Sequence, residues 1–115
     1  MRVAVIGSRD ADEQVLDLIR KHLPPYTTEI VSGGAKGVDR AAGQIAAEEG
    51  IPFREFLPDY TAHGKRAPLV RNDRIIEYAD MVLAFWDGES HGTKYVIGEC
   101  LKRGKRVVYI PLEGE

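Results

Sequence analysis

The sequence predicts an α/β fold, a Rossmann-like three-layer sandwich with a five-stranded parallel sheet and helices on both faces. Short apolar runs alternate with amphipathic runs along the whole 115-residue chain. This alternation is typical of parallel strands joined by right-handed helical crossovers. The runs Val3–Ile6 and Met81–Trp86 are continuously apolar, as expected for strands covered on both faces. With the first strand central, the predicted strand order is 3-2-1-4-5.

The first helix is predicted to follow the strand Val3–Ile6. Asp10 and Glu13 have the spacing of a capping box, which favours a helix start there. One apolar stripe then follows at helical spacing, made of Val15, Leu16, Ile19 and Leu23. Pro24-Pro25 ends this helix.

The second strand, Glu29–Val31, leads through a glycine-rich segment into an alanine-rich helix that ends at Gly50. The third strand is predicted over Phe53–Leu57. Its charges alternate with its aromatic residues, which favours an edge position in the sheet. A polar connection, Pro58–Ala67, comes next.

Pro68 is predicted to start the third helix, with one face carrying Leu69, Ile76 and Ala79. The most apolar strand, Met81–Trp86, follows, and then a loop over Asp87–Gly92. The last helix carries the stripe Thr93, Val96, Ile97, Cys100 and Leu101 and ends at Gly104. The fifth strand is Arg106–Ile110.

The chain is predicted to be a single domain over residues 1–115, long enough for its own core. A net charge of −2 argues against a broad electrostatic grip on nucleic acid. The N-terminus has no signal-peptide pattern and no run is long enough for a membrane span, so a cytoplasmic location is expected. Cys100 is expected to be a buried, inert thiol. His63 and His91 lack metal-ligand spacing, and neither a metal nor a cofactor is predicted.

The most informative segment is Ser32-Gly33-Gly34-Ala35-Lys36-Gly37-Val38-Asp39, between a predicted strand and a predicted helix. Its glycines allow a ligand to approach the backbone, and the helix directs its N-terminal amides toward the same space. This is the chemistry of a phosphate site. The segment lacks the spacing of a dinucleotide fingerprint or a P-loop, so a tight strand-to-helix turn is the alternative.

Other polar loops meet the glycine segment at the carboxyl edge of the predicted sheet, where ligands bind in such folds. They contribute Gly7, Ser8 and Arg9 after the first strand, Arg71 and Asn72 early in the third helix, and Asp87, Gly88, Ser90, Gly92 and Thr93 after the fourth strand. This convergence predicts a shared ligand site.

Each of these residues has a predicted role and a simpler alternative. Arg9 and Arg71 suit phosphate or carboxylate recognition, or are surface arginines. Asp39 or Asp87 suits a ribose hydroxyl, although a carboxylate in the first turn of a helix is favourable without a ligand. Thr93 is an N-cap residue or also faces a phosphate.

Two aromatic residues, Tyr60 and Trp86, are candidates to stack on a base, with core or rim packing as the alternative.

The chain resembles the SLOG superfamily, which joins the DNA-processing protein A family to the LOG phosphoribohydrolases, and most of all its small YspA-like members. The motifs that carry the resemblance are Gly7-Ser8-Arg9, the glycine segment, Arg71-Asn72, Ala79-Asp80, Phe85-Trp86-Asp87-Gly88, Ser90 and Gly92-Thr93. The glycine segment is similar to Ser-Gly-Gly-Ala-Arg-Gly-Ile-Asp of DNA-processing protein A, which binds single-stranded DNA. Lys36 replaces its arginine.

The later half resembles the LOG pattern, in which an arginine precedes Ala/Ser-Asp and a Gly-Thr leads to a catalytic glutamate three residues on. Arg71 and Gly92-Thr93 match, but Val96 stands at the glutamate position. The remaining candidate catalytic residues are Arg71, Asp87, Glu89 and Glu99.

The sequence analysis therefore leads to three hypotheses. The first is binding of a nucleotide or nucleotide-like small molecule at the carboxyl edge. The second is N-glycosidic cleavage of a nucleoside monophosphate, and the third, ranked last, is single-stranded DNA binding. No membrane partner is expected, and an exposed helix or the edge strand offers a surface for a homo-oligomer such as a dimer.

Overall fold

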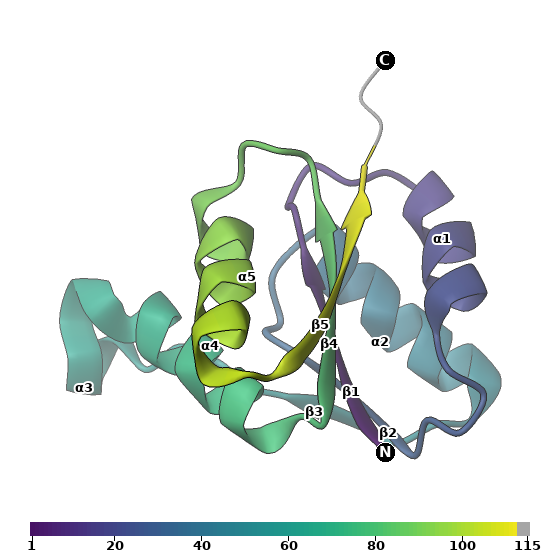
Figure 1. Ribbon diagram of the computed structural model, residues 1–115, viewed down its shortest axis with the longest axis horizontal. Coiled ribbons are helices and arrows are strands. Elements are labelled where there is room, and N and C mark those ends of the chain that lie inside the picture. The colour runs from purple at the N-terminus through teal and green to yellow at the C-terminus, as the bar shows by residue number, and fades with distance from the viewer. Residues whose placement is uncertain (113–115) are drawn as a thin grey trace.

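The computed structural model describes residues 1–112 and has the predicted five-stranded parallel sheet. The strands are β1 (Arg2–Gly7), β2 (Glu29–Ser32), β3 (Phe53–Glu55), β4 (Met81–Trp86) and β5 (Arg106–Pro111). Their order is β3-β2-β1-β4-β5, which confirms the predicted order (Figure 1). The order reverses between β1 and β4, whose registered pairs run from Val3 with Met81 to Gly7 with Phe85.

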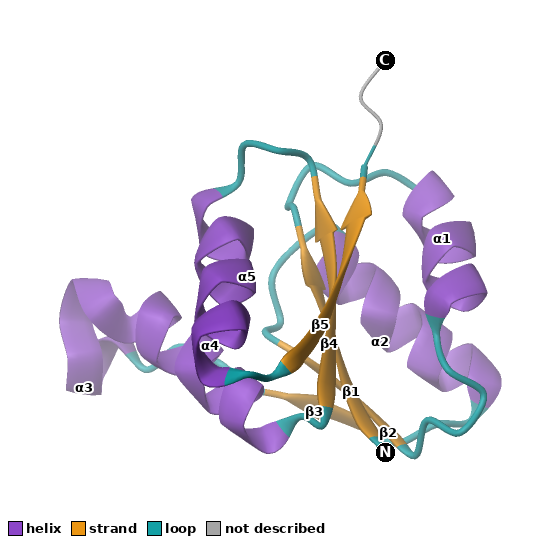
Figure 2. Cartoon of the chain, viewed as in Figure 1, coloured by secondary structure: helices purple, strands orange, loops and turns teal. Residues whose placement is uncertain are grey.

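Helices cover both faces of the sheet, as predicted (Figure 2). They are α1 (Gln14–His22), α2 (Val38–Glu49), the short α3 (Tyr60–His63), α4 (Ala67–Tyr78) and α5 (His91–Arg103), with a 3-10 turn, η1 (Gly64–Arg66), between α3 and α4. The pair α1 and α2 lies on one face, and α4 and α5 lie on the other (Figures 1 and 2).

Alternate side chains of the central strands build two separate cores. From β1, Val3 and Val5 point to the α1/α2 face, while Ala4 and Ile6 point to the α4/α5 face. Both sets are buried, which explains why β1 is apolar at every position from Val3 to Ile6. Cys100 is buried in the second core, and burial raises the pKa of its thiol, as expected for an inert residue.

Two predicted boundaries in the first half are wrong. The capping box of Asp10 and Glu13 does not form: Glu13 is the N-cap without a side-chain cap bond, and Asp12 Oδ1 accepts from the Gln14 amide at 3.0 Å instead. The strand predicted over Phe53–Leu57 stops at Glu55, because the short β2 offers no partner beyond Ser32.

The predicted polar connection Pro58–Ala67 is also wrong, because it contains α3 and η1. Asp59 caps α3, with its Oδ1 accepting from the Ala62 amide at 3.1 Å. A helix of four residues is too short to produce an apolar stripe, so periodicity gave no sign of it.

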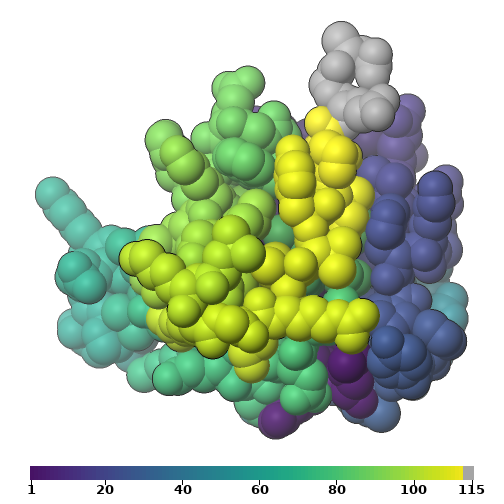
Figure 3. All heavy atoms as spheres, in the orientation of Figure 1, coloured from purple at the N-terminus to yellow at the C-terminus, as the bar shows by residue number. Residues whose placement is uncertain are grey.

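The strand β5 lies at the edge of the sheet opposite β3. Figure 3 shows it uncovered between α5 and α1 on the face in view. Val108 and Tyr109 are exposed there, and the Tyr109 ring packs edge-on against Trp86 at 5.7 Å between centroids. Self-association through an exposed helix or the edge strand predicted over Phe53–Leu57 stays a prediction.

Candidate functional site

A pocket of about 430 Å³ lies at the carboxyl edge where the strand order reverses. The segments after β1, β2 and β4 line it together with the first turns of α4. Ten of the residues predicted from sequence face it, namely Gly7, Arg9, Gly33, Ala35, Asp39, Arg71, Asn72, Ser90, Gly92 and Thr93. The fold therefore brings most of the predicted site residues to one cavity.

Arg71 is the most firmly held charged side chain in this pocket. Its Nη1 donates to the carbonyl of Gly33 at 2.5 Å, and its Nε donates to Asn72 Oδ1 at 2.8 Å. Nη1 also lies 3.5 Å from the Phe56 carbonyl oxygen. Partial burial lowers the pKa of Arg71, and the negative charge of Asp39 opposes that effect, so the side chain stays a cation.

Asp39 lies behind the arginine and is only 6% exposed. Its Oδ2 accepts from the Ala35 amide at 3.1 Å, while its Oδ1, like the buried Ser32 hydroxyl, has no hydrogen-bond partner within residues 1–112. Burial raises the pKa of Asp39, and the Ala35 amide and the Arg71 charge act in the opposite direction. The carboxyl thus stabilises the glycine segment from inside and balances part of the charge of Arg71.

The glycine segment is held in place by hydrogen bonds and by close backbone packing. The Val38 amide donates to the Ser8 carbonyl at 3.2 Å, and the Ala35 amide is used by Asp39. Gly37 has φ +70°, and a Cβ there would clash with the carbonyl oxygens of Ser8 and Arg9. Its position therefore requires glycine, because a tight turn packs against the loop after β1.

Several predicted residues of the glycine segment do not reach the pocket. Gly34 faces the Leu57 side chain, Ser32 is buried beneath the segment, and Lys36 and Gly37 do not line the cavity. Lys36 is exposed to solvent.

The N-terminus of α5 faces the pocket instead. Ser90 is its N-cap and makes no side-chain cap bond, so the alternative that Thr93 is the N-cap is wrong. Thr93 is the third helical residue, and its hydroxyl lies 3.3 Å from Ser90 Oγ. Nothing lies within 4 Å of a Cβ built on Gly92, so the space before this turn is open. The first-turn amides and the positive end of the helix dipole favour an anion there.

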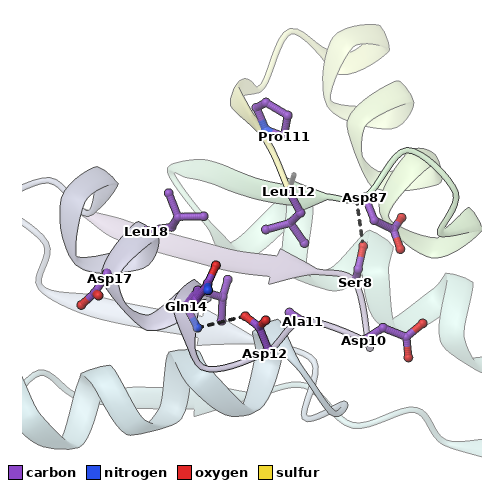
Figure 4. A pocket seen from close by; sticks show the side chains of 11 residues that line it. Ser8, Asp10, Ala11, Asp12, Gln14, Asp17, Leu18, Asp87, Pro111 and Leu112 are labelled. Carbon is purple, nitrogen blue, oxygen red and sulfur yellow. Dashed lines mark hydrogen bonds between the residues drawn. The ribbon is translucent and has the colours of Figure 1, made fainter. Parts of the chain in front are cut away.

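Ser8 and Asp87 line a different hollow, of about 840 Å³, between the loop after β1, α1 and the end of β5 (Figure 4). Asp87 Oδ1 accepts from the amides of Glu89 and Ser90, which lowers the pKa of Asp87, and the Asp87 amide donates to Ser8 Oγ at 3.1 Å. Both residues thus fix the loop after β4. The exposed Gly88, with φ +86°, turns within that loop and lines neither pocket.

Comparison with known proteins identifies the family. The model of the YspA, cpYpsA-related SLOG family matches residues 1–63. The chain belongs to this family. It is also 35% identical over 117 residues to the Gene 61 protein of Mycobacterium phage D29, which covers 93% of this chain and 94% of that protein. The resemblance to the SLOG superfamily is confirmed.

The solved structures include a similar fold. The X-ray structure of DNA processing protein A (DprA) from Streptococcus pneumoniae matches with a TM-score of 0.79 and 23% sequence identity. The match covers 97% of this chain and 50% of the DprA chain, so the SLOG chain described here spans about half the length of that protein. At this identity the likeness shows the fold, and it confirms the Rossmann-like architecture.

The other catalytic candidates of this SLOG chain lie away from the pocket. Glu99 forms ion pairs with Lys102 at 3.3 Å and with Arg103 at 3.2 Å on α5, and Glu89 is exposed on the loop before it. Val96 lines the pocket but is apolar and 1% exposed. Asp39 is the one carboxylate among the described residues that line this cavity.

Sequence reasoning missed the apolar wall of the pocket, formed by Ile6, Pro68, Leu69, Ile75 and Val96. Leu69 carried a signal, because it begins the apolar face of the third predicted helix.

Within residues 1–112, no helix has the length and apolar character needed to cross a membrane, and no cluster of side chains suited to a metal ion occurs.

Proposed function

We propose that this protein binds a nucleotide or nucleotide-derived ligand in the pocket between α4 and α5. The observation that carries the proposal is the pairing of Arg71 with the N-terminus of α5 across one cavity. Arg71 is oriented by Gly33 and Asn72, which leaves its second terminal nitrogen free of any hydrogen bond to residues 1–112. A phosphate between this guanidinium and the helix amides gains charge-assisted hydrogen bonds from both.

Arg9 supplies a second positive charge at the mouth of the same pocket. It is exposed and forms no ion pair with the described residues. The positive charge of Arg9 contributes to the lowered pKa of Arg71, so the two cations lie within electrostatic range of each other. A bound phosphate would reduce the repulsion between Arg9 and Arg71, and this would favour binding of an anionic ligand in the pocket.

The apolar wall supports a ligand with a non-polar part beyond its phosphate. Pro68, Leu69, Ile75 and Val96 line the same cavity as the charged groups of Arg9, Asp39 and Arg71. A lining that combines apolar side chains with a few charged groups is typical of small-molecule sites and fits a base or similar ring joined to a phosphate.

Binding without cleavage is the form of the proposal that the lining favours. N-glycosidic cleavage needs a carboxylate near the anomeric carbon, and Val96 offers none. The carboxyl of Asp39 is buried and already accepts from the Ala35 amide. We therefore expect AMP to remain intact after long incubation, and chromatographic detection of free adenine would overturn this part of the proposal.

Calorimetric titration with AMP, ADP and cyclic AMP tests the binding itself. We expect at least one of these nucleotides to bind, and Arg71→Ala to weaken its affinity at least tenfold, since a charge-assisted hydrogen bond contributes roughly 1.5–3 kcal/mol. Arg74→Ala is the matched control, because Arg74 is exposed on the same helix and does not line the pocket. No binding by folded protein, or equal affinities for the two variants, would contradict the proposal.

A further inference from the structure

We infer that Tyr60 is the base-stacking residue of this pocket and that its ring selects nucleotides over phosphates that lack a base. The inference rests on the proposed function and names the part of the ligand that Tyr60 contacts. Tyr60 is 59% exposed on α3, a helix with no buried residue. Tyr60 does not line the cavity itself, but it lies near Arg71, and its exposed ring is a stacking surface that the fold itself does not use.

All other aromatic residues of the described chain except Tyr26 pack against another group or form a hydrogen bond within the fold. Three aromatic pairs pack ring against ring, namely His22 with Phe85, Phe56 with Tyr78, and Trp86 with Tyr109. The Tyr95 hydroxyl donates to Asp73, and the Phe53 ring lies on Gly43.

Trp86 was an equal candidate for stacking on sequence grounds. Its Nε1 donates to the Ser90 carbonyl at 2.9 Å, so this side chain supports the loop before α5. That leaves two exposed tyrosines, Tyr60 and Tyr26, at 59% and 55% exposure.

Their places in the fold separate these two tyrosines. Tyr26 lies at the amino edge of the sheet, where its carbonyl is 3.5 Å from the N-terminal amine. Tyr60 follows β3 at the carboxyl edge, and α3 packs against α4, the helix that supplies Pro68, Leu69 and Arg71 to the pocket. The Tyr60 phenol is close enough to Arg71 to affect the pKa of its guanidinium.

Leu57 extends the same exposed rim. It is 66% exposed, and its Cδ2 would lie 2.6 Å from a Cβ on Gly34, so it covers the glycine segment next to the pocket. Leu57 and Tyr60 thus place apolar surface near the glycine segment and α4, outside the lining of the cavity itself. A base held between Tyr60 and the apolar α4 wall would remove both from water.

The segment that carries Tyr60 can adjust to a base at little cost in packing. It projects from the body of the molecule (Figure 1), and neither α3 nor η1 contains a buried residue. Gly64 joins them with φ +55°, and nothing lies within 4 Å of a Cβ built there. Movement of Tyr60 toward the pocket would therefore break no core contact.

The experiment compares phosphates with and without a base. AMP, UMP and ribose 5-phosphate are titrated into wild type, Tyr60→Phe, Tyr60→Ala and the control Tyr26→Ala. We expect Tyr60→Ala to weaken AMP binding about 5- to 150-fold, the range that stacking on one aromatic side chain supports. UMP should lose less, because its smaller ring overlaps less, and ribose 5-phosphate should bind all four proteins equally. Tyr60→Phe and Tyr26→Ala should match wild type.

Three results would overturn the inference while leaving the proposed function standing. They are unchanged AMP affinity in Tyr60→Ala, equal loss of AMP and ribose 5-phosphate in that variant, or equal wild-type affinity for both ligands. Failure of wild type to bind any of the three ligands would instead remove the proposed function, and this inference with it.

Discussion

Substituting Gly33 by alanine tests how the pocket holds its arginine. A Cβ at this position would lie 2.7 Å from Arg71 Nη1 and 3.0 Å from Arg71 Cζ, so the guanidinium has to move. The backbone of Gly33 does not have a positive φ, so alanine introduces no backbone strain of its own. The substitution therefore displaces the end of one side chain and leaves the turn in place.

The magnitude follows from what the displaced guanidinium loses. Its 2.5 Å bond to the Gly33 carbonyl and its alignment with the pocket are lost together. If the ligand phosphate depends on this alignment, affinity for AMP should fall about 10- to 150-fold, equivalent to one charge-assisted hydrogen bond of roughly 1.5–3 kcal/mol. The free energy of unfolding should change by only about 1 kcal/mol, because the lost bond is partly offset by the lower chain entropy of alanine in the unfolded state.

The assay is calorimetric titration with AMP alongside urea unfolding. Gly98→Ala on α5 is the control, since nothing lies within 4 Å of its Cβ and the change should stabilise the helix by roughly 0.5–1 kcal/mol without altering binding. The reasoning is refuted if Gly33→Ala binds AMP within about twofold of a wild type that itself requires Arg71.

Four further substitutions test the scaffold. Gly37→Ala should destabilise the fold by about 3 kcal/mol or more in urea unfolding, because its Cβ meets fixed backbone and its φ is positive. Gly50→Ala, which has a similar φ of +68° but open space, should cost only about 1–2 kcal/mol, and equal losses would contradict the packing argument. Burial raises the pKa of Asp39, so the unfolding free energy of wild type falls as the pH rises from about 3.9 through the folded pKa. The stability of Asp39→Asn relative to wild type should therefore increase between about pH 4 and pH 7. A difference that stays constant with pH would contradict this reasoning. The pKa of Asp87 is lowered, so its effect on stability has the opposite pH dependence. Asp87→Ala should be less stable than wild type at pH 7, and this difference in unfolding free energy should disappear as the pH falls below about 4. A difference that persists in acid would contradict this reasoning.

The topology was predictable because the chain contains few competing signals. Continuous apolar runs such as Val3–Ile6 have one explanation, a strand buried on both faces, and both cores use it. The short α3 was not predictable, since its four residues bury nothing and leave no periodic pattern. Length and burial, more than composition, decided which elements the sequence revealed.

The site was predictable as a set of residues but not as a division of roles. Sequence places Ser8 next to Arg9 and Asp87 near Ser90, yet the structure sends one member of each pair to a different hollow. Side-chain direction at a strand end depends on the local turn, which residue types alone do not encode. The role of Gly33 as the acceptor for Arg71 depends on a contact between positions 38 residues apart.

The contacts of Arg71 connect the pocket to the stability of the whole domain. This one side chain on α4 reaches the carbonyls that follow β2 and β3, so the pocket exists only when three distant parts of the chain are assembled. An unfolded chain cannot bind a ligand that needs this arrangement. A ligand at 100 times its dissociation constant would then raise the unfolding free energy by about 2.7 kcal/mol. The melting temperature of the protein thus becomes a direct readout for screening metabolite libraries against it.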